Sequence, residues 1–150
     1  MSVIAWDGRT VAADKRSVHE GLIRETVKLF MIDEETVVGF VGTECQGLAL
    51  VEWYKSGAVK SDYPKFQTVD DWTRLLVFKT GSVYFYESEP YPIKVYDHYM
   101  AWGSGRDYAL AAMYLGKDAR GAIGVSSVFD NNCGNGVTAF DMRKPVCPIL

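Results

Sequence analysis

Residues 3–14 read Val3-Ile4-Ala5-Trp6-Asp7-Gly8-Arg9-Thr10-Val11-Ala12-Ala13-Asp14. Two short β-prone runs, Val3 to Trp6 and Thr10 to Ala13, flank the pair Asp7-Gly8. An Asp-Gly pair between two such runs is typical of a tight hairpin turn. This segment therefore predicts two antiparallel strands, and the polar Asp14 stands at the end of the second.

The same reasoning predicts two more hairpins further along the chain. Their paired runs and turns are Val27 to Ile32 with Thr36 to Val41 around Asp33-Glu34-Glu35, and Thr73 to Lys79 with Ser82 to Glu87 around Thr80-Gly81. Shorter strands are expected at 93–96, 100–102 and 136–142, because these runs are β-prone and are bounded by proline, glycine or polar residues. Residues 58–71 are expected to form a polar loop.

Three helices are expected between these strands. Thr43-Glu44-Cys45-Gln46 has the Thr-x-x-Gln spacing of a capping box, which predicts a helix over 43–56. A second helix is expected over 104–115, and a third over 118–130 with Asp118 as its cap. Strands that precede paired helices indicate an α+β layered fold rather than an alternating parallel βαβ sheet.

Length and composition indicate one soluble globular domain spanning residues 1–150. The chain is 48% hydrophobic and 23% charged, which differs from disordered chains, and no apolar run is long enough to span a membrane. A net charge of -3 gives no basic footprint, so nucleic acid is not expected as the principal partner. The amino terminus lacks the pattern of a secretory signal, and a cytoplasmic location is expected.

Metal and cofactor chemistry are not expected. Cys45, Cys133 and Cys147 are odd in number and lack C-x-x-C spacing, which argues against a disulfide framework or a zinc site. The two histidines, His19 and His98, lie in no metal-binding or triad arrangement. The thiols are expected to be reduced.

Dispersed polar residues end apolar strands or open helices in six segments of the chain. These are Ser2-Val3-Ile4-Ala5, Gly8 to Arg16, Thr26-Val27-Lys28-Leu29-Phe30, Gly39-Phe40-Val41-Gly42-Thr43, Gly103-Ser104-Gly105 and Asp130 to Gly136. In this order, across almost the whole chain, they resemble the proteasome β-type N-terminal nucleophile (Ntn) hydrolases. The resemblance is closest to short proteasome-like proteins of bacteria and phages. It implies a four-layer αββα sandwich, in which two antiparallel sheets pack face to face with helices outside.

The resemblance also implies a role for each matching residue. Ser2 would be the nucleophile after loss of Met1, with its own α-amine as the base. Asp14 and Lys28 match a buried carboxylate and lysine whose ion pair orients the nucleophile. The family's proteases normally use threonine, whose branched Cβ restricts its rotamers, so serine is expected to be the more mobile nucleophile.

Four further residues complete the implied site. The backbone N–H of Gly42 would stabilise the oxyanion at the start of a helix. Ser104 and Asp130 match a supporting hydroxyl and carboxylate near the α-amine, and Cys133 stands where serine or threonine is more usual. Some of the site residues also have a purely structural interpretation: Asp14 as a turn carboxylate, Lys28 as an exposed strand residue, and Cys133 as a packed apolar side chain.

Two functions of different classes follow. The first is a peptidase that acts on peptide or protein substrates and assembles into a homo-oligomeric ring, with an ATPase partner that the sequence does not identify. The second is a catalytically silent structural or assembly protein, phage-encoded in one version of this hypothesis, that keeps the fold. The state of the mature amino terminus separates them: loss of Met1 supports the first and its retention supports the second.

Overall fold

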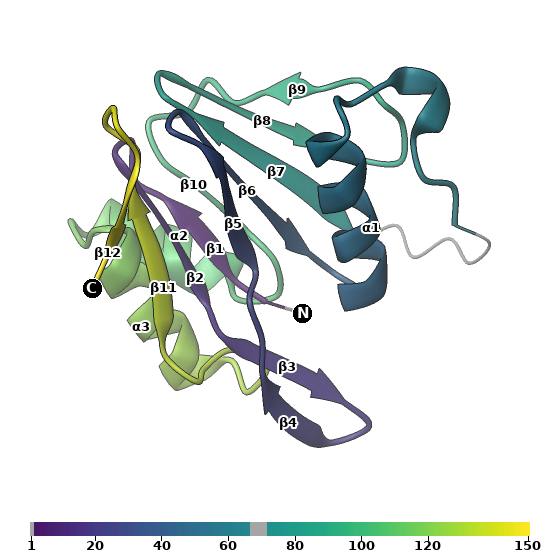
Figure 1. The fold of residues 1–150 in the computed structure, drawn as a ribbon. Helices are drawn as coiled ribbons and strands as arrows, with labels where there is room; N and C mark the ends of the chain where they lie inside the picture. The colour runs from purple at the N-terminus through teal and green to yellow at the C-terminus, as the bar shows by residue number, and fades with distance from the viewer. Residues whose placement is uncertain (1, 67–71) are drawn as a thin grey trace.

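The computed structural model describes residues 2–66 and 72–150. One five-stranded antiparallel sheet contains the strands predicted from residues 3–14 (Figure 1). In spatial order its strands are β10 (Met100–Trp102), β1 (Ile4–Trp6), β2 (Thr10–Asp14), β11 (Val137–Asp141) and β12 (Cys147–Ile149). The turn between β1 and β2 uses Gly8, whose φ of +97° favours glycine. The first predicted hairpin is therefore confirmed.

A second five-stranded antiparallel sheet contains the other two predicted hairpins. In spatial order its strands are β5 (Leu29–Asp33), β6 (Thr36–Val41), β7 (Arg74–Lys79), β8 (Ser82–Tyr86) and β9 (Ile93–Lys94). Both hairpins are confirmed, since β5 pairs with β6 and β7 with β8. The predicted strand at 93–96 is shorter than expected, and ends at Lys94.

The sequence analysis missed three strands. The two-stranded hairpin of β3 (Arg16–His19) and β4 (Leu22–Glu25) turns at Glu20 and Gly21, which both have positive φ. Every residue of β4 is exposed, so no buried alternation marks it in the sequence. The third, β12, contains Pro148 and lies at a sheet edge, where the missing N–H of proline is tolerated.

Three α-helices match the predicted ones to within two residues at each end: α1 (Glu44–Lys55), α2 (Arg106–Tyr114) and α3 (Ala119–Phe129). Asp118 caps α3 as predicted, because its side chain accepts a hydrogen bond from the backbone N–H of Gly121 at 2.8 Å. Part of the predicted loop 58–71 forms a short 3-10 helix, η1 (Lys60–Asp62), and residues 67–71 lie outside the described residues.

The predicted capping box at the start of α1 is wrong. Thr43 is the N-cap residue but makes no side-chain cap hydrogen bond. Gln46 is buried, and its amide oxygen accepts from the hydroxyl of Thr73, which lies just before β7. A tertiary partner has therefore replaced the local one, because the buried amide gains its hydrogen bond from a neighbouring strand instead.

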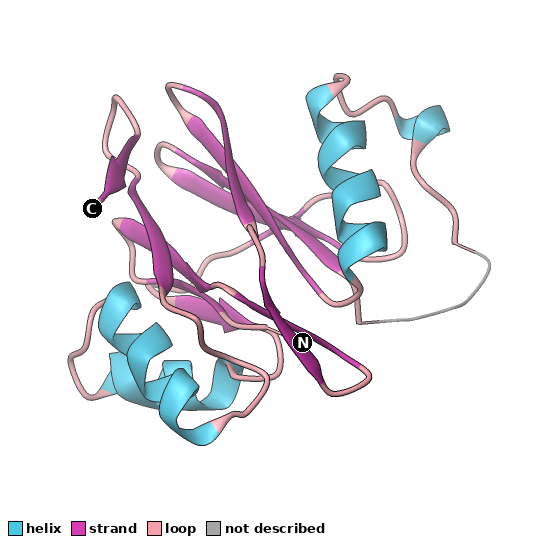
Figure 2. Ribbon diagram, turned by 60° about the horizontal axis from the view of Figure 1, so that its bottom comes forward, coloured by secondary structure: helices cyan, strands magenta, loops and turns pink. Residues whose placement is uncertain are grey.

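Hydrophobic packing joins the sheets and helices in three clusters. Residues of β1, β2, β10 and β11 meet residues of β5 to β8 in the cluster that includes Ile4, Trp6, Val11, Leu76, Phe78 and Trp102. A second cluster packs α2 and α3 on the β1–β2 face, and a third packs α1 on β6 and β7. The helices therefore lie on the outer faces of the two sheets (Figure 2). The structure confirms an α+β fold built on antiparallel sheets.

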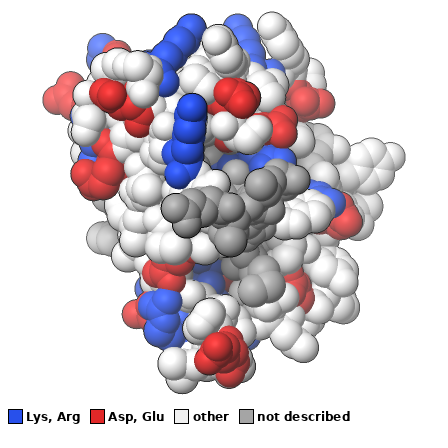
Figure 3. Space-filling model, turned by 90° about the vertical axis from the view of Figure 1, so that its right-hand side faces the viewer, with Lys and Arg blue, Asp and Glu red and all other residues white. Residues whose placement is uncertain are grey.

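Two surface properties complete the description. On the face shown in Figure 3, acidic and basic side chains are interspersed. Among the described residues, no helix combines the length and apolar character needed to cross a membrane.

Candidate active site

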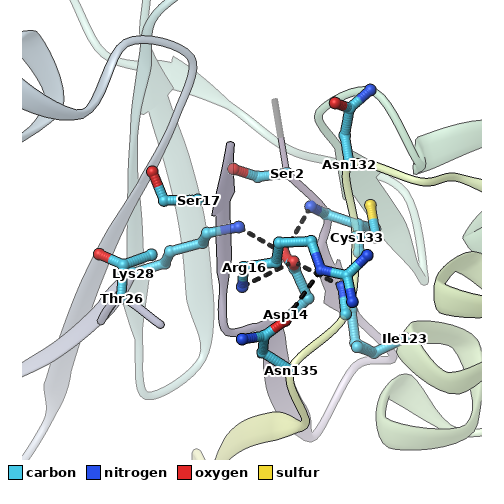
Figure 4. Close-up of polar contacts among 12 residues, drawn as sticks. Ser2, Asp14, Arg16, Ser17, Thr26, Lys28, Ile123, Asn132, Cys133 and Asn135 are labelled. Carbon is cyan, nitrogen blue, oxygen red and sulfur yellow. Dashed lines mark hydrogen bonds and ion pairs between the residues drawn. The ribbon is translucent and has the colours of Figure 1, made fainter. Parts of the chain in front are cut away.

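The carboxylate of Asp14, at the end of β2, is fully buried and accepts four hydrogen bonds (Figure 4). Its Oδ1 accepts from the Val3 backbone N–H at 3.1 Å and from Lys28 Nζ at 2.6 Å. Its Oδ2 accepts from the backbone N–H groups of Arg16 and Gly134, each at 3.1 Å. Three segments distant in sequence therefore converge on one carboxylate, which fixes its position.

Lys28 stands directly before β5 and is 3% exposed, which excludes the interpretation as an exposed strand residue. Burial lowers the pKa of the Lys28 ammonium, while Asp14, and to a lesser extent Cys133 and Glu44, act in the opposite direction. A buried ion pair costs desolvation energy, and a buried group with a shifted pKa is a candidate for function.

Ser2 is 2% exposed and lies two residues before the start of β1. Its carbonyl oxygen accepts from the Gly105 backbone N–H at 3.2 Å and from the Ser104 hydroxyl at 3.4 Å. The peptide that follows Ser2 is held by Asp14 through the N–H of Val3. The Ser2 backbone is thus fixed from two directions, by the end of β2 and by the loop that opens α2.

The loop 103–105 approaches Ser2 so closely that it requires glycine. A Cβ on Gly103 would lie 2.1 Å from the Ser2 carbonyl oxygen, and the φ of this residue is +100°. A Cβ on Gly105 would lie 2.9 Å from Cys133 Sγ and 3.1 Å from Val3 Cβ. Gly103 and Gly105 therefore allow the loop to contact both the Ser2 backbone and Cys133.

Asp130 and Cys133 follow α3 in the chain, and both contact this loop. Asp130 accepts from the Asn132 backbone N–H at 2.9 Å and from Cys133 Sγ at 3.4 Å. Burial alone would raise the pKa of Asp130, but hydrogen bonds from Asn132, Ser104 and Cys133 hold it below its usual range. The Ser104 hydroxyl is therefore within hydrogen-bond reach of both the Asp130 carboxylate and the Ser2 carbonyl, and its single proton is donated to one of them at a time.

The Cys133 thiol is fully buried, as expected for a packed apolar side chain, but it also donates a hydrogen bond to Asp130. Burial raises its pKa to about 12, and the negative charges of Asp14 and Asp130 act in the same direction. A thiol with this pKa is protonated near neutral pH, whereas the thiolate is the reactive form. Cys133 is therefore unsuited to be the nucleophile.

Gly42 follows β6 and precedes α1, with a φ of +101°. It borders two pockets. One, of about 600 Å³, is also lined by Gly103 and Ser104, which contact Ser2. The other, of about 670 Å³, is lined by residues of β3, β4 and the first turn of α1. The structure thus places Gly42 on the same pocket as the residues around Ser2.

A polar cluster in the second pocket was missed in the sequence analysis. The Glu44 carboxylate, in the first turn of α1, accepts from Ser17 Oγ at 3.0 Å, from Thr26 Oγ1 at 2.7 Å and from the Arg24 guanidinium. Burial would raise the pKa of Glu44, but these hydrogen bonds lower it. The Glu20-Gly21 turn was the signal that could have revealed the β3–β4 hairpin supplying Ser17 and Arg24.

Arg16 is a further residue that the sequence analysis did not assign to the site. Its Nε donates to Asn135 Oδ1 at 2.8 Å and its Nη1 donates to the Asn131 carbonyl at 2.9 Å. These contacts brace the loop whose Gly134 N–H binds Asp14 (Figure 4). The Arg16 side chain therefore supports the carboxylate indirectly, through a loop more than a hundred residues away in sequence, in addition to the direct hydrogen bond from the Arg16 backbone N–H.

The fold is similar to that of a solved bacterial protein. A structure of Thiobacillus denitrificans BPH in complex with epoxomicin matches with a TM-score of 0.73 and 20% sequence identity, and the match covers 100% of both chains. A second structure of Thiobacillus denitrificans BPH gives a TM-score of 0.69 at 20% identity, and covers 99% of this chain and 98% of that one. These matches show that the chain shares the fold of this bacterial protein over its whole length.

Sequence comparisons give no family assignment. No protein-family model matches the chain. No curated protein matches it either.

Proposed function

We propose that this protein is a proteasome-like Ntn hydrolase that cleaves peptide amide bonds with Ser2 as its nucleophile after removal of Met1. Two kinds of observation support the fold assignment. The two antiparallel sheets share a hydrophobic cluster and carry helices on their outer faces, as expected for a four-layer αββα sandwich. The likeness to BPH extends over the full length of both chains.

The observation that carries the proposal is the buried ion pair beside Ser2. Lys28 Nζ and the amide of Val3 bind the same oxygen of Asp14, so the ammonium and the Ser2–Val3 peptide are held by one atom. A buried positive charge favours loss of a proton from a nearby hydroxyl. A role of the Lys28–Asp14 pair in a reaction at Ser2 would explain why the fold keeps an ion pair whose burial costs desolvation energy.

The base in this proposal is the α-amine of Ser2, which hydrolysis of the Met1–Ser2 amide would liberate. The pKa of an α-amine is about 8, so an appreciable fraction of the amine is neutral at physiological pH and can accept a proton. Ser2 Oγ attacks the substrate carbonyl carbon while its proton passes to the α-amine. The C–O bond forms as the carbonyl electrons move to oxygen, and Gly42 N–H donates to the resulting oxyanion at the amino-terminal end of α1.

The intermediate then collapses and breaks the C–N bond. The α-ammonium returns its proton to the departing amine, which leaves the acyl group esterified to Ser2 Oγ. A water molecule attacks this ester and gives its proton to the α-amine, and a second collapse releases the carboxylic acid and restores Ser2. In this scheme Ser104 and Asp130 orient the Ser2 backbone, and Cys133 supports Asp130 as a hydrogen-bond donor.

The test begins with the intact mass of the purified chain, which is expected to lack one methionine. Epoxomicin, a proteasome inhibitor, is expected to add to the peptide that begins at Ser2. Ser2→Ala is expected to abolish both labelling and hydrolysis of small peptide amides. Ser127→Ala is a matched control, because this serine lies on α3 and binds the Ile123 carbonyl of its own helix.

The outcomes separate the two candidate functions. Labelling that persists in Ser2→Ala would show that the nucleophile is another residue. Absence of labelling and turnover in chains proven to begin at Ser2 would favour the catalytically silent assembly protein. Retention of Met1 would have the same meaning, because Ser2 would then carry an amide in place of the basic amine.

We extend the proposal to assembly as a homo-oligomeric ring. Large apolar side chains are exposed on the paired helices α2 and α3 and at the C-cap of α2, including Tyr114 at 78%, Leu115 at 80% and Val128 at 75%. Exposed apolar surface of this kind is typical of protein interfaces. Light scattering at micromolar concentration is expected to give a mass several times that of one chain, and a monomeric mass would contradict the extension.

A further inference from the structure

Thr73 and Gln46 are buried polar residues outside the set that the sequence singled out as a site. They are 6% and 7% exposed. Thr73 Oγ1 donates to Gln46 Oε1 at 3.0 Å and accepts from the Thr43 backbone N–H at 3.1 Å. One hydroxyl therefore joins the residue before β7 to the first turn of α1 and to the residue that follows Gly42.

Thr73 also lies directly against Gly42. A Cβ on Gly42 would lie 2.5 Å from Thr73 Cα and 2.6 Å from Thr73 Oγ1. The contact is so close that only hydrogen atoms fit between Gly42 and this side chain. The Gly42 Cα is thus confined by steric contact with Thr73, and the Gly42–Thr43 peptide is confined by the hydrogen bond from the Thr43 N–H to Thr73 Oγ1.

The helix that carries Gln46 is itself seated closely on the sheet. Gly47 is the next residue, and a Cβ there would lie 2.1 Å from the ring of Phe40 on β6. A residue larger than glycine at position 47 would push α1 away from β6. The absence of a side chain at Gly47 therefore sets the distance between the sheet and the helix turn that carries Gln46. The Gln46 amide therefore provides a rigid anchor for the Thr73 hydroxyl.

We propose that Thr73 and Gln46 are positioning residues that fix the direction of the Gly42 N–H. The inference rests on the proposed function, in which this N–H stabilises the oxyanion. Oxyanion donors act when they are held in place before the reaction, and errors of a fraction of an ångström or about 10–20° weaken them. The burial of a Thr–Gln pair at this turn is explained by that requirement.

The test compares Thr73→Val with Thr73→Ser. Valine has nearly the shape of threonine but neither donates to Gln46 nor accepts from Thr43, whereas serine keeps the hydroxyl. Thr73→Val is expected to lower kcat by about 10-fold or more with little change in KM, because the lost interaction acts in the transition state. Thr73→Ser is expected to restore most of kcat, which a purely steric role would not explain.

Thr36→Val is the matched control, since Thr36 is 5% exposed and lies at the opposite end of β6 from Gly42. It is expected to leave kcat unchanged.

Amide exchange gives a readout independent of turnover: the Thr43 N–H is expected to exchange faster in Thr73→Val than in the parent chain. If Thr73→Val does not fold, Gln46→Met is tested for the same loss of kcat. This variant removes the oxygen that accepts from Thr73 Oγ1 and keeps the hydrogen bond from the Thr43 N–H to Thr73 Oγ1.

The failures of the two proposals are distinguishable. A parent chain that is labelled at Ser2 and turns over, with a folded Thr73→Val variant that keeps kcat within about twofold, would overturn the positioning role and leave the hydrolase intact. A rise in KM at constant kcat would overturn it as well. A parent chain beginning at Ser2 that neither labels nor turns over would overturn the proposed function, and the positioning role with it.

Discussion

Lys28 Nζ lies 2.6 Å from Asp14 Oδ1, and their side chains are 2% and 0% exposed. The two residues come from different sheets: Asp14 ends β2, and Lys28 precedes β5. Because both charges are removed from water, each depends on the other for compensation. This pair therefore connects the stability of the fold with the chemistry proposed for Ser2.

Removing either partner alone is expected to destabilise the protein strongly. Lys28→Met or Asp14→Asn leaves the other group buried without its partner, which costs about 3–5 kcal/mol. The double variant is expected to lose much less than the sum of the two singles. Urea unfolding of the four proteins measures this coupling, and additive losses would contradict it. Lys144→Met is the control, because Lys144 pairs with Glu35 at 2.8 Å on the surface, where solvent screens the charges and the expected loss of stability is small.

Gly103→Ala is expected to impair both folding and activity. The added Cβ would be forced against the Ser2 carbonyl oxygen at 2.1 Å, in addition to the strain of a φ of +100°. Gly116→Ala separates the two effects, because Gly116 has a φ of +95° and nothing within 4 Å of the added atom. The control is expected to lose about 1–2 kcal/mol from backbone strain alone. Equal losses in thermal unfolding would argue against tight contact at Ser2.

Cys133 is expected to resist alkylation in the folded protein. Burial and the nearby carboxylates raise its pKa to about 12, so iodoacetamide at pH 8 meets a protonated, inaccessible thiol. Cys45 and Cys147 are exposed and provide internal controls. Mass spectrometry of digested protein is expected to show modification at these two sites within the native state and at all three in urea. Early native modification of Cys133 would contradict the raised pKa.

Stability is expected to fall in acid partly through Asp141, the last residue of β11. Hydrogen bonds from the Arg143 side chain and backbone hold the pKa of Asp141 well below its usual range. Because the pKa of Asp141 is lower in the folded state, the unfolded chain binds a proton at this carboxylate more readily than the folded chain does. The stability that ionised Asp141 contributes is therefore fully present above about pH 4 and is lost as the pH falls further. Urea midpoints between pH 2.5 and 6 are expected to decline less steeply for Asp141→Asn than for the parent. Identical slopes would contradict the prediction.

Peptide hydrolysis is expected to rise with pH through the titration of the Ser2 α-amine. The amine must be neutral to accept the Ser2 proton, and model amines titrate at about 7.7–8.0. A plot of kcat/KM against pH is therefore expected to climb with a midpoint near about 8. Chains that retain Met1 serve as the control and are expected to be inactive across the range. A flat profile between pH 6.5 and 9 would argue against the α-amine as base.

Patterns in the amino-acid sequence were enough to predict most of the local elements. Asp7-Gly8 and Thr80-Gly81 marked hairpins that the structure contains, and Asp118 marked the start of α3, because turns and caps depend on neighbours a few residues apart. The β3–β4 hairpin was missed because all four residues of β4 are exposed, and an exposed strand carries no alternating pattern.

The candidate residues Ser2, Asp14 and Lys28 were selected through their resemblance to a family, since each is an ordinary residue in isolation. Tertiary structure decided their contacts. Lys28 and Asp14 are 14 residues apart, and Asp14 ends a strand of one sheet whereas Lys28 precedes a strand of the other, so no local rule could place the ammonium on the carboxylate. Gly134, 120 residues beyond Asp14, completes that carboxylate's hydrogen bonds.

The hydrogen-bond partner of Gln46 could not be predicted from the sequence. Its spacing from Thr43 predicted a local cap, but in the structure its amide binds Thr73, 27 residues away. Both partners can satisfy a buried polar group, and the choice depends on which one the packing of α1 on β6 brings within reach. Capping signals act through local geometry, whereas the orientation of Gly42 depends on contacts that exist after the sheet and helix have packed.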